Sequence, residues 1–300
     1  MKFDPYRQIL LSLLGLGMAL GPSPALASDT GKSYKPKIVS LDYCADQYVL
    51  ALADRNQILA LSQDADKGHS FHKDRALGLP KFHSTMAEVI ALQPDVAVQS
   101  WRVTDRIENM ITRIGTKLVV PKYGSDPEIV IGNVRLAGQR FDQKKRAATL
   151  IDNYRSRLKN LRAVPRIPLR AAYVTPGGFT AGIGTFVDEI IQLAGFSSYA
   201  ASRGLVNWQA LPMEDLLIDP PDLFIASFFD TSLATQSGWS IARHNRLYQM
   251  LQDIPTIYLP GRYLSCNGLF LVDAAERIRS YAIEKKIISY KSTLEVVHKK

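Results

Sequence analysis

Apolar and polar residues follow a helical period through the middle of the chain. Between residues 143 and 162 the apolar side chains recur at spacings of four and three: Ala147, Ile151, Tyr154, Leu158 and Leu161. This spacing forms one apolar face of a helix, and the lysines and arginines of the segment fall on its other faces. A helix of this length without Gly or Pro is roughly 30 Å long. The pattern therefore predicts a stiff linking helix between two halves of the chain.

Before this helix, short apolar runs alternate with patterns of helical period. The predicted strands are residues 37–41, 58–62, 96–98 and 117–120, and the predicted helices are residues 47–53, 86–92, 104–114 and 126–140. Residues 42–46 are predicted to form a turn after the first strand. Strands that alternate with helices in this way favour an α/β lobe with a mostly parallel sheet.

The second half repeats this order of elements. Its predicted strands are residues 171–174, 223–226 and 256–259, its predicted helices are residues 186–194 and 214–218, and residues 176–184 are predicted to be a long turn. Residues 88–98 and 214–226 share an acidic helix start, an apolar turn, Pro-Asp and a buried strand. The repetition predicts two similar lobes with central, mostly parallel sheets, joined by one long helix. The limits are 36–142 for the N-terminal lobe, 143–162 for the linking helix and 168–288 for the C-terminal lobe.

The first 27 residues have the pattern of a signal peptide. Lys2 and Arg7 form a basic head, residues 9–21 form an apolar run, and Ala25 and Ala27 form a small-x-small site. The apolar run is shorter than the ~20 residues that span a membrane. We expect cleavage near Ala27, no lipid anchor because no Cys follows that site, and a soluble mature protein in an oxidising periplasm.

The net charge is positive but dispersed. The chain carries +9, and the loss of Lys2, Arg7 and Asp4 with the signal peptide lowers this to +8. Such a charge favours anionic ligands or membrane surfaces, or it forms only a solvated surface. The chain has no basic stripe, which argues against nucleic acid as a partner.

Catalytic motifs are missing from the sequence. The glycines at 177, 178, 182 and 184 lack the G-x-G-x-x-G spacing, and no G-x-S-x-G elbow occurs. Asp188 and Glu189 are adjacent on a predicted helix and point about 100° apart, so they do not form a carboxylate pair. We therefore expect a protein that is not an enzyme. An exported hydrolase remains the remote alternative.

Five segments taken together resemble one known family. They are IVSLDYCADQ, EVIALQPDVAV, the linking helix, FTAGIGTFVDEIIQLAG and MEDLLIDPPDLFIAS. In order and spacing, over residues 36–288, the chain resembles the periplasmic substrate-binding proteins of ABC importers for ferric siderophores, haem and cobalamin. The resemblance implies a monomer without a cofactor of its own, which holds a metal chelate between two lobes that close little. It also implies delivery of that chelate to an inner-membrane ABC permease.

The resemblance also implies the ligand-binding residues. Trp208 falls at the spacing of a pocket tryptophan in the cobalamin binders of the family, and Trp101 falls within a residue of another. The carboxyl ends of parallel strands are also where ligands bind in such lobes. The further candidates at strand ends are Tyr43, Cys44, Arg102, Tyr173, Phe179, Arg262 and Tyr263. Aromatic faces and arginines suit large planar or chelated ligands, although each residue could instead belong to a core rim or a solvated surface.

Several ligands are open at this stage. A ferric siderophore ranks first, because the protein is basic and many ferric siderophores are anionic, and a cobalamin-like corrinoid ranks second. Haem or a bare transition-metal ion is the alternative. His69, His72 and His83 share one loop and could bind zinc or manganese, with only His244 in the second lobe, but a solvated loop is the simpler interpretation. No metal site is predicted.

In the resembled family one glutamate from each lobe pairs with permease arginines. Glu214 lies seven residues before Pro221, where that glutamate is expected. In the first lobe the equivalent position is Ala87, and Glu88 is one residue further, which turns its side chain by about 100° on a helix. Both glutamates are also explained as helix-start carboxylates favoured by the helix dipole.

The two cysteines follow strands in different lobes. Cys44 follows the first predicted strand and Cys266 follows the last, so both should face the cleft. An oxidising compartment permits a disulfide between them, provided that their Cα atoms lie within about 7 Å. Two free buried thiols, or sulfur contacts to a ligand metal, are the alternatives.

Overall fold

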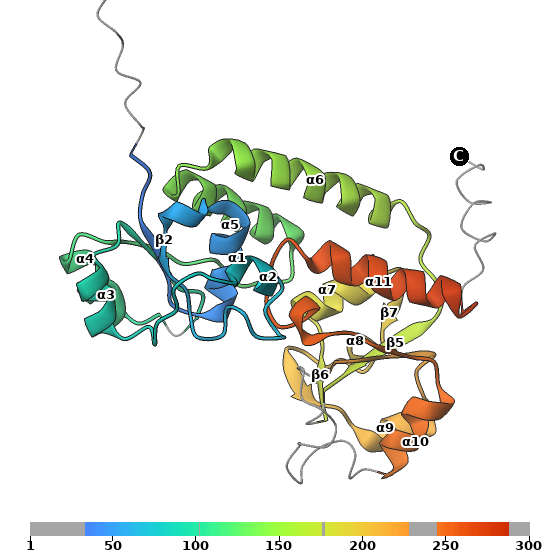
Figure 1. Ribbon diagram of the computed structural model, residues 1–300. Helices are drawn as coiled ribbons and strands as arrows, with labels where there is room; N and C mark the ends of the chain where they lie inside the picture. Colours follow the sequence, from blue (N-terminus) through green and yellow to red (C-terminus); the bar gives the residue numbers. More distant parts are fainter. Residues whose placement is uncertain (1–33, 102, 176–177, 228–244, 288–300) are drawn as a thin grey trace, which may run out of the picture. The chain divides into compact units, whose positions relative to one another are not determined.

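Figure 1 shows the computed structural model, which describes residues 34–101, 103–175, 178–227 and 245–287. The predicted signal peptide and its cleavage near Ala27 lie outside these residues. In the described part of the chain, no helix combines the length and the apolar character needed to cross a membrane.

The N-terminal lobe is built on a four-stranded parallel sheet. Its strand order is β2-β1-β3-β4. The strands are β1 (Ile38–Ser40), β2 (Ile58–Ala60), β3 (Val96–Val98) and β4 (Lys117–Val119). The α-helices are α1 (Tyr43–Leu52), α2 (Lys73–Ala76), α3 (Met86–Leu92), α4 (Asp105–Arg113) and α5 (Pro127–Arg140), and a 3-10 helix spans Arg55–Gln57. The predicted alternation of strands and helices is confirmed.

Helix α1 begins four residues before its predicted start. Asp42 is its N-cap, and the carboxylate accepts hydrogen bonds from the backbone N–H groups of Cys44 and Ala45. An N-cap carboxylate satisfies amides that have no partner within the helix, which favours a helix start here. The prediction that Tyr43 and Cys44 lie in a turn is therefore wrong, because both belong to the first turn of α1.

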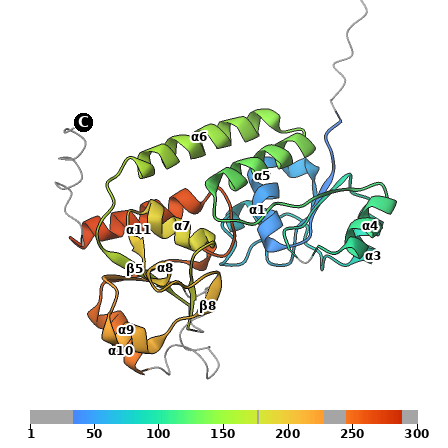
Figure 2. The ribbon, with the colours of Figure 1, turned by 180° about the vertical axis from the view of Figure 1, so that it is seen from behind.

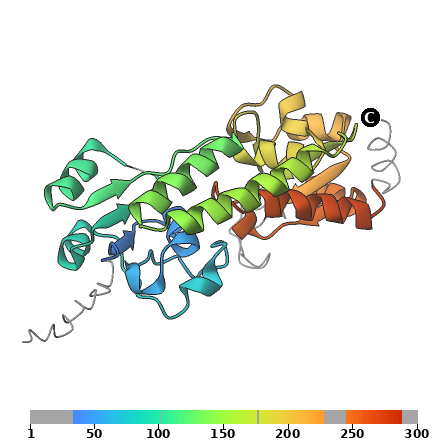
Figure 3. The same ribbon diagram turned by 90° about the horizontal axis from the view of Figure 1, so that it is seen from above.

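The linking helix α6 (Lys144–Arg162) packs on both lobes. It lies along α5 on one side and along α11 (Leu271–Glu284) and α7 (Phe186–Leu193) on the other (Figure 3). Arg157 of α6 forms a bidentate pair with Glu276 of α11, at 2.9 Å from Nε and 2.5 Å from Nη2. Asp273, one turn earlier in α11, approaches the same guanidinium. The two bonds raise the pKa of Arg157 above its usual range.

The C-terminal lobe has its own four-stranded parallel sheet, in the order β10-β9-β5-β7. The strands are β5 (Arg170–Val174), β7 (Ser197–Ser198), β9 (Leu223–Ala226) and β10 (Thr256–Tyr258). Besides α7 and α11, its described helices are α8 (Tyr199–Ser202), α9 (Met213–Ile218) and α10 (Asn245–Asp253), with a 3-10 helix at Gly261–Tyr263. Helices α9 and α10 lie side by side (Figures 1 and 2) over a small core that contains Leu216, Leu247 and Leu251.

The two lobes repeat one topology. If the strands of each sheet are numbered along the chain, both sheets have the order 2-1-3-4. The repeated Pro-Asp sequence has the same role in each lobe. Asp95 accepts a hydrogen bond from the backbone N–H of Lys37 at 2.6 Å, and Asp222 accepts one from the backbone N–H of Arg170 at 2.7 Å. Each aspartate thus holds the start of the central strand of its sheet, and the predicted two-lobe α/β fold is confirmed.

Part of the predicted long turn is a strand that pairs with a distant segment of the chain. Strand β6 (Phe179–Ala181) pairs antiparallel with β8 (Trp208–Ala210), and the register sets Ala181 opposite Trp208. Phe179 therefore lies in a strand and not in a turn. The strand was missed because its partner is almost 30 residues away in the chain, beyond the reach of local patterns.

One buried cluster runs through both lobes. It includes Ile38 and Val98 from the first sheet, Ile151 from α6, and Tyr173 and Ile278 from the second lobe. The predicted lobe limits at residues 142 and 168 stay predictions, since no break in this core marks them.

Candidate ligand-binding pocket

A pocket of about 640 Å³ lies between the two lobes. This volume is within the range of small-molecule sites, roughly 300–1,000 Å³. The N-terminal lobe supplies Cys44, Tyr48, Ser100, Trp101, Pro121, Lys122 and Tyr123, and the C-terminal lobe supplies Thr175, Phe186, Asn207, Trp208, Leu264, Ser265, Cys266 and Asn267. Five of these side chains are aromatic, so a ligand would meet mainly ring faces and edges.

Trp208 and Tyr123 connect the two sides of the pocket. The indole Nε1–H of Trp208, on β8, donates to the hydroxyl of Tyr123, which follows β4, at 3.3 Å. Phe186, at the start of α7, meets both rings edge-on, at 6.0 Å from Tyr123 and 6.2 Å from Trp208. Trp208 is 40% exposed and Tyr123 59% exposed, so both rings retain surface that a ligand can cover.

Trp101 forms another aromatic part of the wall. It follows β3, is 48% exposed, and meets the ring of Tyr43 edge-on at 5.0 Å. Tyr43 itself is not part of the lining but supports Trp101 from α1. Burial, followed by the charges of Asp42 and Asp64, raises the pKa of Tyr43 to about 12, so its phenol is neutral near pH 7.

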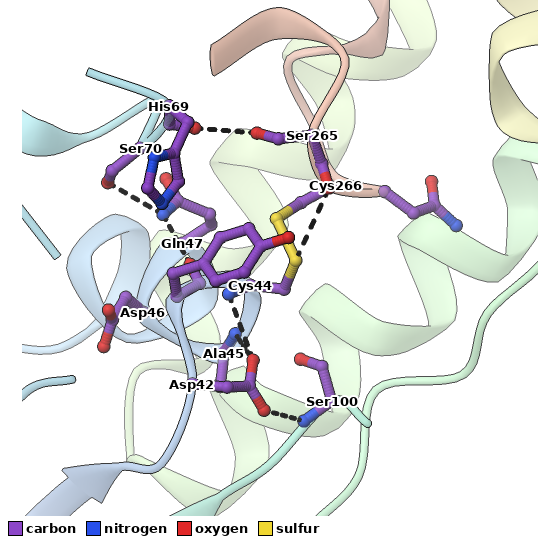
Figure 4. Close-up of a disulfide and its surroundings, with 12 residues drawn as sticks. Asp42, Cys44, Ala45, Asp46, Gln47, His69, Ser70, Ser100, Ser265 and Cys266 are labelled. Atoms are coloured by element: carbon purple, nitrogen blue, oxygen red, sulfur yellow. Dashed lines mark hydrogen bonds between the residues drawn. A yellow bond between two sulfur atoms is a disulfide. The ribbon is translucent and has the colours of Figure 1, made fainter. Parts of the chain in front are cut away.

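A single buried carboxylate holds the two elements behind this wall. One oxygen of Asp42 caps α1, and the other accepts the backbone N–H of Ser100 at 2.6 Å (Figure 4). Burial raises the pKa of Asp42, and hydrogen bonds from the backbone of Ala45, Ser100, Cys44 and Trp101 oppose that rise. Asp42 therefore fixes Cys44, in α1, relative to the segment after β3 that carries Trp101.

Cys44 and Cys266 form a disulfide in the pocket wall (Figure 4). Their Cα atoms are 5.5 Å apart and the bond joins residues 222 positions apart in the sequence. The sequence left open a disulfide, two free thiols or sulfur contacts to a ligand metal, and the structure has the disulfide.

Residues 264–270, here called the strap, carry Cys266 and hold the C-terminal lobe against the N-terminal lobe. Ser265 Oγ donates to the carbonyl of His69 at 2.7 Å, and Asn267 Nδ2 donates to the carbonyl of Gly124 at 2.8 Å. The hydroxyl of Tyr48 donates to the backbone carbonyl of Asn267 at 3.0 Å. Phe270, at the end of the strap, stacks on Phe71 with ring centroids 4.6 Å apart. The strap is thus joined to the first lobe at Ser265, Cys266, Asn267 and Phe270.

The pocket offers few polar groups. Among its described lining residues, Lys122 is the one cationic side chain, it is exposed, and no carboxylate or histidine occurs. Burial raises the pKa of Tyr48 to about 12, so that phenol also stays neutral near pH 7. Ser100 Oγ and Asn267 Oδ1 have no hydrogen-bond partner in the protein. Both atoms are buried, so a ligand reaches neither of them unless the wall moves.

Besides Tyr43, four of the predicted binding residues lie outside the lining. Tyr173 is buried behind Trp208, with ring centroids 6.0 Å apart, and Phe179 is exposed on β6. Tyr263 is buried in the core, where its hydroxyl accepts from Arg277 Nε at 2.8 Å. Arg262 lies over the ring of Tyr263, 5.1 Å from its centroid. These residues are therefore not part of the wall of this pocket, and Arg102 lies outside the described residues.

Sequence reasoning missed four important lining residues. Tyr123 follows a parallel strand, as Trp101 does, so the strand-end rule applied to β4 would have found it. Tyr48 lies four residues after Cys44 on α1 and shares its helix face. Phe186 and Asn267 carry no local signal, because the folding of α7 and the strap brings them to the pocket.

The described histidines are not part of a metal-ligand cluster. Within residues 34–101, 103–175, 178–227 and 245–287, no group of three His, Cys, Asp or Glu side chains could hold a metal ion. His69 meets the ring of Tyr43 at 4.9 Å. Burial, followed by the charge of Arg75, lowers the pKa of His72 to about 4. His244 is not among the described residues.

The two candidate docking glutamates lie at helix starts. Glu88 belongs to a capping box on α3, in which its carboxylate accepts from Thr85 Oγ1 at 2.7 Å and from the Thr85 backbone at 3.0 Å. These bonds lower the pKa of Glu88. Glu214 is exposed in the first turn of α9. Their use in docking stays a prediction.

Comparisons with known proteins bear on the fold. No protein-family model matches the chain, and no curated protein matches it either. Solved structures do match. One is the periplasmic heme binding protein HutB of Vibrio cholerae, with a TM-score of 0.66, 21% identity, and coverage of 82% of this chain and 98% of that one.

Two further structures are named for other ligands. The periplasmic vitamin B12 binding protein BtuF of Vibrio cholerae has a TM-score of 0.62 at 19% identity, covering 82% of this chain and 96% of that one. The ABC-type Fe3+-hydroxamate transport system structure from Saccharomonospora viridis has a TM-score of 0.61 at 17% identity, covering 82% and 93%. The chain therefore has the fold of periplasmic binding proteins with two lobes and a helical backbone.

Proposed function

We propose that this protein is the periplasmic substrate-binding component of an ABC importer and that it captures a metal chelate in the pocket between its lobes. The observation that carries the proposal is the pocket itself. It is walled by Trp101, Tyr123 and Trp208, is of small-molecule size, and is shared by both lobes of a fold whose solved examples are periplasmic binding proteins. Ring faces provide a large contact area at low entropic cost, which suits a large rigid chelate.

A ferric siderophore or a cobalamin-like corrinoid is the proposed ligand. Both carry their own metal ligands, so neither needs a carboxylate or histidine from the pocket, and the described lining supplies neither group. Among structures of this fold, one is named for vitamin B12 and one for Fe3+-hydroxamate transport. The positive net charge of the chain would also attract anionic ferric siderophores.

Haem is the second candidate. The observation in its favour is Tyr123, which belongs to the lining, since a tyrosine can ligate haem iron. Several solved structures of the fold are also named as heme-binding proteins. A bare metal ion is less well supported, because the described residues contain no metal-ligand cluster.

Tryptophan fluorescence tests the proposal directly. Two of the three tryptophans, Trp101 and Trp208, line the pocket. We expect that ferric aerobactin, an anionic hydroxamate siderophore, cyanocobalamin or hemin quenches the emission with a saturable curve in the micromolar range or below. The Trp101→Phe and Trp208→Phe variants should each lose part of that quenching.

The same titration separates the alternatives. Saturable binding of hemin alone would favour haem, and a melting temperature raised by zinc alone would favour a bare metal ion. Failure of all three chelates to bind would contradict the proposed function. Turnover of a chromogenic ester or glycoside by the purified protein would instead favour a hydrolase.

The delivery step gives a second test. Under the proposal, Glu214, and Glu88 on the other lobe, face arginines of the permease. Glu214→Lys should leave chelate affinity unchanged and abolish uptake of that chelate by cells that depend on this receptor. Normal uptake by both the Glu214→Lys and Glu88→Lys variants would exclude this mode of docking.

A further inference from the structure

The strap carries one cysteine of the disulfide and also forms part of the pocket wall. Four of its residues, Leu264, Ser265, Cys266 and Asn267, line the pocket, and Cys44 on the opposite side of the disulfide lines it too. The strap follows the last strand of the second lobe, yet its polar contacts are with His69, Gly124 and Tyr48 of the first lobe. Part of the wall therefore depends on how firmly this segment is held.

Only one of the bonds that hold the strap responds to redox conditions. The hydrogen bonds of Ser265 and Asn267 exchange readily with water when the segment moves, because each is a single neutral bond. The disulfide keeps the two backbones at a Cα separation of 5.5 Å for as long as it is intact. Cleavage would leave the strap held by hydrogen bonds and by the Phe71–Phe270 stack.

We propose that the Cys44–Cys266 disulfide is a redox-sensitive element of the pocket, so that its cleavage by a dithiol frees the strap and weakens ligand capture. This inference rests on the proposed function, because it concerns the ligand of the same pocket. It assigns the disulfide more than a stabilising role: the oxidised chain is the receptor with high affinity, and the reduced chain is a weaker one.

The chemical step is a thiol–disulfide exchange. Cys266 is 3% exposed, whereas Cys44 is half-buried, so a small dithiol that enters the pocket reaches Cys44 Sγ more easily. A thiolate of the dithiol attacks that sulfur, the Cys44–Cys266 bond breaks, and Cys266 leaves as a thiolate that takes up a proton. The second thiol of the reductant then closes on the mixed disulfide and releases Cys44. The dithiol becomes a cyclic disulfide, and two electrons and two protons have passed to the protein.

Reduction should act on binding through the position of Asn267. The side-chain amide of Asn267 donates to Gly124, and its Oδ1 has no partner in the protein. Because Asn267 follows Cys266 directly, cleavage of the disulfide loosens the backbone that carries this side chain and its bond to Gly124. A less ordered pocket loses ligand affinity, since ordering must then occur on binding. We expect faster dissociation with little change in the association rate.

Coupling between two equilibria is reciprocal. If reduction weakens the binding of a chelate by some factor, saturation with that chelate must make reduction less favourable by the same factor. A disulfide that only stabilises the fold would show no such relation at temperatures where both forms are folded. This reciprocity is the signature that separates the proposal from a structural role.

The test compares the oxidised chain, the chain reduced with dithiothreitol and freed of it under argon, and the reduced chain after reoxidation. The probe is whichever of ferric aerobactin, cyanocobalamin and hemin binds the oxidised chain, and circular dichroism verifies that each form is folded. We expect Kd to rise at least tenfold on reduction and to recover its original value on reoxidation. The Cys44→Ser/Cys266→Ser variant should have the same raised Kd as the reduced chain. Ser202→Ala, outside the pocket, serves as a matched control without effect.

A second measurement follows the dithiol concentration needed for half-reduction, with and without saturating probe, by mass spectrometry of trapped thiols. The midpoint ratio should shift by the factor found for Kd. Equal Kd values in both redox states, an unshifted midpoint, or resistance of the folded protein to dithiol would overturn the inference while leaving the receptor intact. If no probe binds the oxidised chain, the proposed function itself fails.

Discussion

The indole of Trp208 in the C-terminal lobe donates a hydrogen bond to the hydroxyl of Tyr123 in the N-terminal lobe at 3.3 Å. Trp208 begins β8, Tyr123 lies in the loop that follows β4, and each residue is partly exposed and lines the pocket. A ligand that enters between the lobes must therefore either stack on this pair or separate it.

Trp208 should contribute more to affinity than Tyr123. We expect Trp208→Ala to weaken chelate binding by roughly 10- to 100-fold, because a central aromatic anchor is typically worth about 2 kcal/mol or more. Tyr123→Phe keeps its ring and loses one hydrogen bond, so it should cost less than about tenfold. Fluorescence or calorimetric titration measures both. Phe179→Ala, an exposed ring outside the lining, is the control, and an equal loss in that variant would contradict the assignment of the pocket.

Asp42 should be more important for stability than an ordinary helix cap. In Asp42→Asn, one carboxylate oxygen is replaced by an NH2 group. In one orientation of the amide this group faces the backbone N–H of Ser100, and in the other it faces the N–H groups of Cys44 and Ala45. An unmet buried donor costs about 1–3 kcal/mol, and this loss should appear in urea unfolding. Asp126→Asn, at the exposed cap of α5, should cost less than about 1 kcal/mol. Similar losses in the two variants would refute the role given to Asp42.

Asp46 should make the protein less stable as the pH rises from 4 to 6. It is fully buried, and burial raises its pKa to about 6 against hydrogen bonds from Ser62. Since the folded-state pKa lies above the unfolded value, the stabilising contribution is present below pH 4 and is lost as the pH passes through 6. Asp46→Asn should remove this dependence, a change of up to about 3 kcal/mol. Urea unfolding at pH 4, 5, 6 and 7 measures it, and parallel curves for variant and wild type would be the contrary result.

The titration of His72 should change protein stability in the opposite direction to that of Asp46, over a similar pH range. Its folded-state pKa is lowered to about 4, so its stabilising contribution is present above pH 6.5 and is lost as the pH falls towards 4. His72→Gln should therefore lose less stability than the wild type on acidification, by roughly 2 kcal/mol. His83→Gln, in an exposed loop, is the matched control. A flat difference between His72→Gln and wild type across this range would show that the imidazole titrates normally.

The fold was largely predictable because its signals are local. Residues 86–92 and 96–98 have the predicted limits, since Thr85 caps the helix and Pro94 prevents its continuation. The start of α1 was misplaced because the capping role of Asp42 was not recognised. Strands β6 and β8 were not found, because their pairing depends on contact between distant segments.

The pocket was predictable only in part. Trp101 and Cys44 were found because each lies beside the end of a parallel strand, and Trp208 was found from its spacing in the resembled family. The same rule failed for Tyr263, whose side chain turns inward to Arg277 and Phe71. Position along a strand gives the edge of the sheet, but packing against neighbouring helices decides whether a ring faces the pocket or the core.

The Arg157–Glu276 pair and the shared core have a consequence for the folding of the chain. Although its two halves look like copies of one unit, neither half can bury the apolar face of α6 alone, because that face is covered partly by α5 and partly by α11. Heat or urea should therefore melt both halves in one cooperative transition, and a fragment ending at residue 163 should not be an autonomous domain. The duplication is visible in the topology, but the thermodynamic unit is the whole.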